Sequence, residues 1–450
     1  MTSDSVKILA DAFAGAIERK EANSLLPVIE SAHASDIAAA FSLLDDEDRR
    51  AAIDVAGDAI PPKTLLYFDG DVLLGVAEAL GQERFSRCVG ALTSDEAVSV
   101  LEELPEDECE QALARLRRTR FLREVRQGLS YPEDSVGRLM NRDVVHIPEY
   151  WTVGQAVDYM RSSVRRPDFR FHYVYLADPT LRPVGFVSPA QMLCAARTVP
   201  LKELVSEEPL HPVDPNMDQE EAAHVFRRYG LAAAPVIDER GVLIGEVGVD
   251  RILDVIDEEA QEDIMHLGGV NDSDLYRSPL NAVKSRAPWL TVNLLTTVGG
   301  AMVISSFQSS IQHLSVLAVL LPVIACLAGN AGTQALTVVV RALSLRELSS
   351  ANVGRTLRKE LLVGFANGAL LAALAGAATG IIYGNAGLSA VFAAAIWGAI
   401  GVSGVLGALI PIGLEKCGAD PAIASSVFLI AITDALSFAF LLAGAYWLLL

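Results

Sequence analysis

The sequence predicts a multi-domain protein with an α-helical solenoid-like N-domain, an α/β middle region built from a twofold repeat, and an all-α membrane domain with five transmembrane helices. Acidic residues concentrate in the first 287 residues, which carry a net charge of −21, whereas the remainder carries +1. A pattern of strands and helices recurs after about 60 residues within residues 131–257. Five apolar segments, each long enough to cross a bilayer, follow from residue 288.

Residues 1–130 are predicted to form short antiparallel helices. Apolar residues recur at helical spacing, as in Ile37, Phe41 and Leu44, and turns rich in Ser, Asp and Pro separate the runs. Several of the acids fall in first turns, where they complement the helix dipole, and we interpret the acids of this domain as caps and solvated faces. Asp95 is also a candidate metal ligand, at the place where this domain would meet its neighbour.

Residues 131–257 alternate β-type runs with helices, and the series occurs twice. The segment 183–187 (Pro-Val-Gly-Phe-Val) matches the segment 243–247 (Leu-Ile-Gly-Glu-Val). This strand-helix-strand-strand-helix repeat resembles a tandem pair of CBS domains. The resemblance implies a sensory module, and because many such pairs bind adenine nucleotides, ATP is a candidate ligand of this region.

A dense acidic run, residues 257–263, opens a segment that should link the soluble region to the membrane through a helix within residues 258–287. Charge runs are usually solvated faces, but packed acids repel one another, and a divalent cation between two faces would remove that repulsion. Ligands that offer only oxygen suit Mg²⁺ or Ca²⁺ and not zinc. The candidate regulatory ligands are Asp95, Asp214, Asp250, Asp254, Glu258, Glu259 and Glu262.

The predicted membrane domain, residues 288–450, contains apolar segments at about 288–306, 314–340, 360–383, 390–414 and 422–449. Basic residues gather in the connection 341–359 and are missing from 307–313 and 384–389. By the positive-inside rule, the N-terminal domains are then cytoplasmic and the C-terminus lies outside. The first residues show no signal-peptide pattern, which agrees with a cytoplasmic soluble region.

Asp434 is the one acid deep inside a predicted span. A carboxylate at a helix centre costs roughly 2.5–3.5 kcal/mol on insertion scales, so it is either kept protonated or bonded to another helix, or it forms a cation site in a pore. In the second span, Pro322 and the run Gly329-Asn330-Ala331-Gly332 should loosen the helix. Asn330 then either bonds another helix at a kink or offers a neutral oxygen to a hydrated cation.

Together these stretches resemble the MgtE family of magnesium channels and transporters. The matching motifs are Tyr-Pro-Glu-Asp-Ser-Val-Gly-Arg-Leu-Met at 131–140, Ala-Gln-Glu-Asp-Ile at 260–264, Gly-Asn-Ala-Gly-Thr-Gln at 329–334 and Asp-Pro-Ala at 420–422, besides Pro322 and Asp434. The resemblance implies a homodimer in the lipid of the plasma (inner) membrane, with a central pore lined by the second and fifth spans. It also implies that Asp434 and Asn330 face the transported Mg²⁺, and that cytoplasmic Mg²⁺ bound to the regulatory acids closes the pore.

Two positions depart from the family pattern. The Asp-Asp pair that many relatives carry after the second CBS strand is Asp250-Arg251 here, which replaces an acidic ligand by a positive charge, and the Gly-Gly-Asn of the second span is Ala328-Gly329-Asn330.

Several function classes stay open or are disfavoured. Another transported ion, Mn²⁺, Co²⁺ or Ca²⁺, remains an alternative, because one hard carboxylate per subunit does not exclude it. A membrane-anchored nucleotide sensor is a second alternative, although an anchor would not need an intramembrane Asp. The acidic charge argues against nucleic acid as a partner. We do not expect an enzyme, because the seven histidines form no catalytic or metal-binding pattern.

Overall fold

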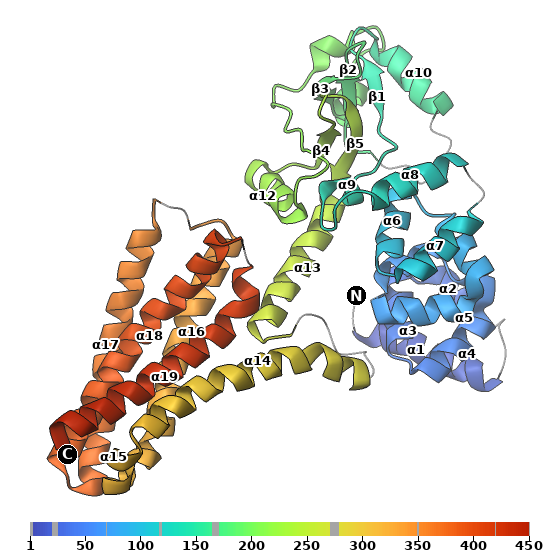
Figure 1. Ribbon diagram of the computed structural model, residues 1–450. Helices are drawn as coiled ribbons and strands as arrows, with labels where there is room; N and C mark the ends of the chain where they lie inside the picture. Colours follow the sequence, from blue (N-terminus) through green and yellow to red (C-terminus); the bar gives the residue numbers. More distant parts are fainter. Residues whose placement is uncertain are drawn as a thin grey trace. The chain divides into compact units, whose positions relative to one another are not determined.

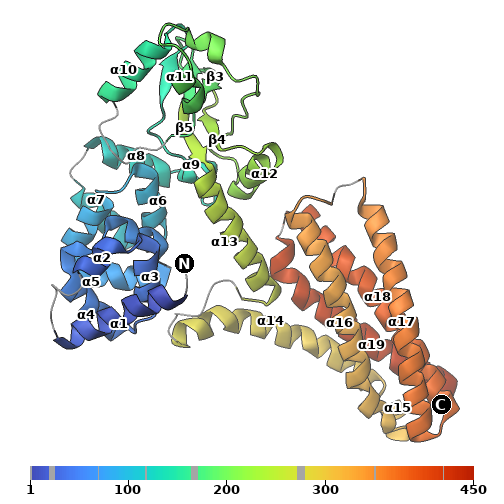
Figure 2. The same ribbon diagram turned by 180° about the vertical axis from the view of Figure 1, so that it is seen from behind.

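The computed structural model describes residues 3–19, 26–68, 70–116, 119–163, 171–270, 279–348, 351–418 and 420–449. It divides into two compact units, Met1–Glu258 and Glu259–Leu450 (Figures 1 and 2). The first unit contains a helical domain followed by an α/β repeat, and the second contains long apolar helices. The predicted fold class is therefore confirmed.

The N-domain is a stack of short helices around one apolar core that includes Phe13, Phe41 and Leu73. Its α5 contains a break at Gly81, whose φ of +71° is a backbone conformation that favours glycine. The helices of this domain are α1 (Ser3–Arg19), α2 (Leu26–Ser31), α3 (Ala34–Ser42), α4 (Asp46–Ala56), α5 (Gly70–Val89), α6 (Ser94–Glu102), α7 (Glu106–Arg115) and α8 (Thr119–Leu129), with 3₁₀ turns at Gly57–Ala59 and Pro62–Tyr67.

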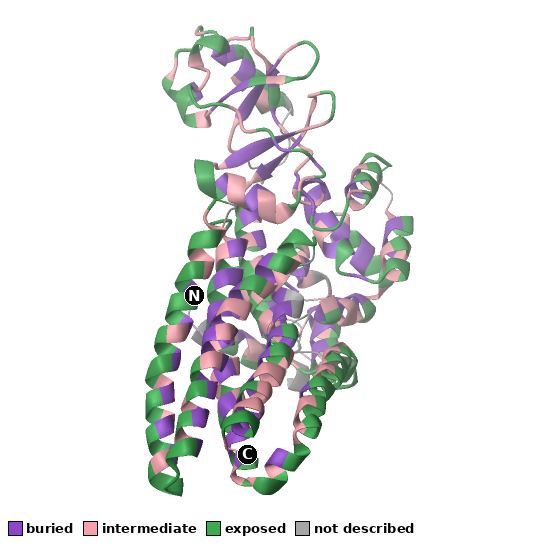
Figure 3. Ribbon diagram, turned by 60° about the vertical axis from the view of Figure 1, so that its left-hand side comes forward, coloured by how far each residue is buried: buried purple, intermediate pink, exposed green. Residues whose placement is uncertain are grey.

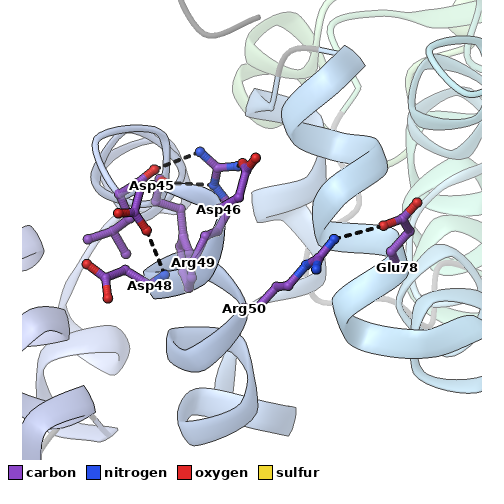
Figure 4. Close-up of polar contacts among 8 residues, drawn as sticks. Asp45, Asp46, Asp48, Arg49, Arg50 and Glu78 are labelled. Atoms are coloured by element: carbon purple, nitrogen blue, oxygen red, sulfur yellow. Dashed lines mark hydrogen bonds and ion pairs between the residues drawn. The ribbon is translucent and has the colours of Figure 1, made fainter. Parts of the chain in front are cut away.

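Many acids of the N-domain cap helices or form ion pairs, as their positions predict. Asp45 caps α4 by accepting a hydrogen bond from the backbone N–H of Asp48 at 2.8 Å (Figure 4). In the same helix, Arg49 donates to Asp46 at 2.8 Å, and Arg50 reaches Glu78 of α5 at 3.2 Å. These acids are thereby explained by local structure alone.

The α/β region contains the predicted repeat. The first copy comprises β1 (His146–Pro148), α10 (Val153–Ser163), β2 (Val174–Ala177), β3 (Pro183–Val187) and α11 (Pro189–Cys194). The second comprises α12 (Gln219–Tyr229), β4 (Ala233–Ile237), β5 (Leu243–Gly248) and α13 (Val249–Leu267). In the first copy β1 pairs parallel with β2, and β2 antiparallel with β3. In the second, β4 pairs antiparallel with β5, and a single parallel bridge from Val213 to Val236 takes the place of β1. The short helix α9 (Val136–Leu139) and the 3₁₀ turn Leu201–Leu204 complete the region.

Equivalent glycines allow close packing in both copies. A Cβ added at Gly185 would lie 2.6 Å from Val205 Cγ1, and one added at Gly245 would lie 2.8 Å from Met140 Sδ. Both distances are too short for real side chains, so each strand needs glycine where a neighbouring segment crosses it. The matching pentapeptides in the sequence thus reflect the same packing requirement.

The second unit contains five helices that are long and apolar enough to cross a membrane, among the residues that the structure describes. They are α14 (Pro279–Ser306), α16 (Val316–Ser344), α17 (Val353–Tyr383), α18 (Ala386–Lys416) and α19 (Pro421–Leu449), and the short α15 (Gln308–His313) joins the first two. Figure 3 shows buried residues where the long helices of this unit pack together and exposed residues on their outer faces. Half of the residues in the apolar 18-residue stretch of α18 are buried, compared with 6% in α14, so α18 forms the centre of the unit.

Small residues allow α17 and α18 to pack closely. A Cβ added at Gly364 would lie 3.2 Å from the carbonyl oxygens of Ile400 and Gly401, and one at Gly404 would lie 3.3 Å from the carbonyl oxygen of Glu360. Close approach of backbones at glycine is a common way to join helices in membranes.

The predicted linking segment and the predicted loosening of the second span both differ in detail from the structure. Residues 258–287 include the end of α13 and the start of α14, and residues 271–278 lie outside the described parts.

α16 is one continuous helix through Pro322 and through Gly329-Asn330-Ala331-Gly332, so the expectation that this run loosens the helix was wrong. The Thr333 hydroxyl donates to the Gly329 carbonyl oxygen at 2.9 Å, which gives that carbonyl a second partner.

Candidate functional site

A polar face runs along α16 in an otherwise apolar helix. Cys326, Asn330, Thr333 and Thr337 follow one another at spacings of three and four residues, and all are exposed. Residues on the opposite face, such as Ala328 and Leu336, are buried. Asn330 Nδ2 donates to Cys326 Sγ at 3.6 Å within the same helix, which leaves its carbonyl oxygen available on the exposed face. We call Cys326, Asn330, Thr333 and Thr337 the polar face of α16.

Asp434 lies in α19, which packs directly against α16. Its side chain is half-buried. Thr433 and Ser437 of the same helix are both 0% exposed, and the Thr433 hydroxyl donates to the Ile430 carbonyl oxygen at 3.1 Å. The two helices approach closely at Gly332 of α16. A Cβ added there would lie only 3.1 Å from Leu429 Cδ1 of α19. The two predicted ion-facing residues, Asn330 and Asp434, thus stand on neighbouring helices.

In the first unit, Asp95 is engaged by an arginine. Arg251 Nη2 lies 3.1 Å from Asp95 Oδ2, and the Asp95 side chain is buried at the start of α6. The other oxygen, Oδ1, is buried without a hydrogen-bond partner among the described residues. This ion pair joins the N-domain to α13 of the repeat. Arg251, which departs from the Asp-Asp pair of the family pattern, therefore has a structural role here.

A second ion pair joins the same two parts of the first unit. Arg138 of α9 lies 3.1 Å from Glu102 at the end of α6. Burial raises the pKa of Glu102 to about 7, although the Arg138 guanidinium acts in the opposite direction. Neither residue was identified from the sequence, because no local pattern pairs two positions 36 residues apart.

Carboxylates gather around this contact. Desolvation raises the pKa of Glu258, and the like charges of Asp254, Glu103 and Asp134 raise it further. The pKa values of Asp254 and Asp134 are also raised, first by desolvation and then by neighbouring acids. Burial is the larger cause of these shifts, and the smaller contribution from like charges is the one that a bound cation would relieve.

The remaining predicted regulatory acids are more dispersed. Asp214 is exposed and accepts a hydrogen bond from the Asn216 backbone at 2.8 Å, and Asp250 is exposed in the first turn of α13. Glu259 and Glu262 belong to the part of α13 in the second unit. In the described ranges, no three His, Cys, Asp or Glu side chains are close enough to hold a metal ion directly. The predicted ligands therefore do not form a complete inner coordination shell within one chain.

A cavity of about 310 Å³ lies between the two copies of the repeat. Aromatic rings line it: Tyr173 and Phe186 lie with centroids 4.4 Å apart, and His211 stacks on Tyr229 at 3.9 Å. Tyr175, also in the lining, is fully buried, and its hydroxyl has no hydrogen-bond partner among the described residues. Flat aromatic faces suit a planar heterocycle.

The end of α13 also holds a polar contact that sequence reasoning missed. The His266 ring is 5% exposed and lies 3.2 Å from Asp420, next to α19. The only signal in the sequence was a histidine beside an acidic run.

Comparison with known proteins identifies three family models along the chain. Residues 321–444 match the model described as "Divalent cation transporter", MgtE; residues 32–134 match the MgtE intracellular N domain; and residues 136–196 and 201–258 match the CBS domain. These ranges agree with the helical domain, the α/β repeat and the long apolar helices of the structure.

Similar proteins extend over most of the chain. The chain is 33% identical to the magnesium transporter MgtE of Enterococcus faecalis over 311 residues, 69% of this chain and 68% of the relative. It is 28% identical to the magnesium transporter MgtE of Thermus thermophilus over 434 residues, 95% of both chains. Among solved structures, the cytosolic domain of the Mg²⁺ channel MgtE in complex with ATP matches with a TM-score of 0.50 and 25% identity, and covers 55% of this chain and 99% of that one.

Proposed function

The chain belongs to the MgtE family of magnesium transporters, and on this premise we propose that it conducts Mg²⁺ along a path formed by α16 and α19, with Asp434 and Asn330 facing the ion. The observation that carries the proposal is the exposed polar face of α16. Polar groups on a membrane-spanning helix are tolerated where they face water or another protein surface, and not where they face lipid. A water-filled path between two copies of the chain would satisfy this requirement.

The chemistry of this path suits a hydrated divalent cation. Mg²⁺ sheds its waters reluctantly and keeps several of them in most sites. In a homodimer, two Asp434 carboxylates would attract the ion from both sides while the Asn330 carbonyl oxygens accept hydrogen bonds from its waters. Uptake needs no nucleotide hydrolysis, because an inward membrane potential contributes roughly 4.6 kcal/mol per Mg²⁺ for every 100 mV. The N-terminal domains would be cytoplasmic and the C-terminus outside.

We further propose that cytoplasmic Mg²⁺ closes this path by binding to the acids of the first unit and of α13. Support comes from the carboxylates of Glu258, Asp254 and Asp134, whose pKa values are raised first by burial and further by neighbouring acids where the N-domain meets the repeat. No three of the described His, Cys, Asp or Glu side chains are close enough to coordinate an ion directly. We therefore propose that Mg²⁺ binds there with its water shell, or that a second copy of the chain supplies further ligands. A ligand that binds the closed state more tightly shifts the population toward it.

We propose ATP as the ligand of the cavity between the CBS copies. The similar cytosolic domain was solved in complex with ATP. The aromatic lining around Tyr173, Phe186 and Tyr229 offers stacking surfaces for a base. This binding would regulate transport and is not a catalytic step.

Mg²⁺ entry into proteoliposomes tests the pore and its control together. Wild type is compared with Asp434→Asn at low and high Mg²⁺ on the cytoplasmic face. A hydrogen bond to a charged group is worth about 1.5–3 kcal/mol, and about 1.4 kcal/mol is tenfold. Since a homodimer loses two such groups, entry should fall about 100-fold in Asp434→Asn, and Asn330→Ala should reduce it less.

Glu415→Gln, which removes an exposed acid at the end of α18, is the matched control and should transport like wild type. Entry unchanged in Asp434→Asn would show that this carboxylate is structural and would refute the proposed path. Competition by Mn²⁺, Co²⁺ and Ca²⁺ in the same assay identifies the preferred ion, and absence of any cation entry would favour the sensor alternative.

A further inference from the structure

An apolar cavity lies inside the N-domain. Its volume is about 250 Å³, and its walls come from α3, α4, α5 and the 3₁₀ turn Pro62–Tyr67 (Figure 1). Phe41, Ile53 and Phe68 line it and are 0%, 1% and 6% exposed, so its floor belongs to the apolar core of the domain. For comparison, an engineered apolar cavity of about 150 Å³ in another protein binds benzene. At the same packing, this cavity has room for an apolar group of roughly ten carbon atoms.

The kink in α5 forms one wall of the cavity. Val76 and Leu80 precede the kink at Gly81, and Arg84 and Arg87 follow it, and all four side chains line the cavity. Val76 and Leu80 are buried, whereas Arg84 and Arg87 are exposed. The cavity therefore has an apolar interior and a positively charged rim, which come from the two halves of one helix.

The rim offers hydrogen-bond donors to an anion. Arg84 and Arg87 are the charged side chains among the described residues that line the cavity. Arg84 Nη1 lies 4.0 Å from the position of a Cβ added at Gly57, another lining residue, so this guanidinium stands at the edge of the cavity. Each guanidinium has five N–H donors and can bind a carboxylate while it keeps a contact within the protein. Charge and shape together favour a ligand with an anionic end and an apolar body.

We propose that this cavity binds an amphipathic carboxylate, whose alkyl chain of about eight to ten carbon atoms fills the apolar interior while its carboxylate pairs with Arg84 and Arg87. All of the residues involved belong to the N-domain, so the inference does not depend on the proposed transport path or on its control by Mg²⁺. Cys88 also lines the cavity and is partly buried. A bound chain should cover its thiol, so the reactivity of Cys88 reports whether the cavity is occupied.

Isothermal titration calorimetry of the full-length protein in phosphatidylcholine nanodiscs measures the affinity, with the heat of empty nanodiscs subtracted. The probes are butyrate, hexanoate and octanoate, with octanol as the uncharged analogue. Burial of one CH₂ group corresponds to about fourfold in affinity, so each added pair of carbon atoms should tighten binding about 15-fold. A hydrogen bond to a charged group corresponds to about 10- to 150-fold, so octanol should bind at least about tenfold more weakly than octanoate.

Substitutions at the rim separate the charge from the cavity. Arg84→Gln and Arg87→Gln should each weaken octanoate binding about tenfold or more and leave octanol binding unchanged, because the apolar interior stays intact. Weakened octanol binding in these variants would indicate a collapsed cavity and would refute the role given to the guanidinium groups. Arg50→Gln removes an exposed arginine of α4 that pairs with Glu78 outside the cavity, and as the matched control it should bind octanoate like wild type.

Alkylation of Cys88 by iodoacetamide, followed by mass spectrometry, locates the ligand. With octanoate at ten times its Kd, about 90% of the sites are filled, so alkylation of Cys88 should slow about tenfold. Cys194, exposed on α11, is the internal control and should react at the same rate with and without octanoate. Octanoate binding that leaves the alkylation of Cys88 unchanged would overturn the site. Binding no greater than that of empty nanodiscs would overturn the proposal, and octanol binding as tight as octanoate would refute the anionic ligand.

Discussion

Glu246 provides a direct test of the energetics inside the CBS pair. It lies in β5, is 4% exposed, and its Oε2 has no hydrogen-bond partner among the described residues. Burial raises the pKa of Glu246 from 4.5 to about 7, and the charge of Asp250 adds to this, although the nearby Tyr175 hydroxyl acts in the opposite direction. Replacing the carboxyl group by the neutral amide in Glu246→Gln removes this titration while keeping size and shape.

The magnitude follows from the pKa difference. A carboxyl group whose folded pKa is raised contributes stability that is complete below the unfolded pKa of 4.5 and is lost as the pH rises through about 7. One pKa unit corresponds to about 1.4 kcal/mol, so wild type loses about 3 kcal/mol between these limits. Glu246→Gln should therefore match wild type near pH 4 and be about 3 kcal/mol more stable than wild type at pH 8.

Hydrogen exchange of the β4 and β5 amides in the full-length protein measures this difference as a free energy of opening at each pH. Glu239→Gln, which changes an exposed residue in the turn between the same strands, is the control and should show no such trend. Equal protection of wild type and Glu246→Gln at pH 8 would refute the conclusion that the buried carboxylate destabilises the strand pair.

The structure supports two further predictions. Arg251→Ala leaves Asp95 buried without its cation, which should cost about 3–5 kcal/mol of stability. The double replacement Arg251→Met with Asp95→Leu removes both charges and should cost much less. Thermal unfolding in detergent measures both variants, with Arg240→Ala, at an exposed position, as the control. Tyr229→Ala should weaken ATP binding to the full-length protein about 10- to 100-fold, because stacking of a base is worth about 1–3 kcal/mol, and Tyr229→Phe should bind normally. Absence of ATP binding by wild type in a calorimetric titration would exclude ATP from the cavity.

The parts of the fold that follow from short-range patterns were predictable. Five apolar segments predicted five long helices, and the two related pentapeptides predicted equivalent strands. Each of these signals is contained in one short, continuous stretch of sequence. Helix boundaries were less accurate: α17 begins at Val353 rather than near residue 360, since Arg355 and Arg358 interrupt the apolar pattern without ending the helix.

The contacts that join distant elements were not predictable. Asp95 was singled out as a metal ligand, but no local pattern indicated that Arg251, 156 residues away in the chain, would pair with it. Glu246 occupies the position equivalent to Phe186 in the first copy, so the repeat alone suggested an apolar residue there. Asp434 and Asn330 were identified because a charge or an amide in a transmembrane segment is costly, and their roles in transport remain proposals.

The ion pair between Arg251 and Asp95 also has a consequence for the proposed control by cytoplasmic Mg²⁺. A guanidinium attached to the chain has a fixed local concentration, so it cannot be diluted out of the interface or removed by a chelator. The contact between α6 and α13 therefore has a constant component that is independent of the cytoplasm. Under the proposed control by cytoplasmic Mg²⁺, the carboxylates around Glu258 would respond to a change in free Mg²⁺, while the Arg251–Asp95 ion pair beside them would stay formed.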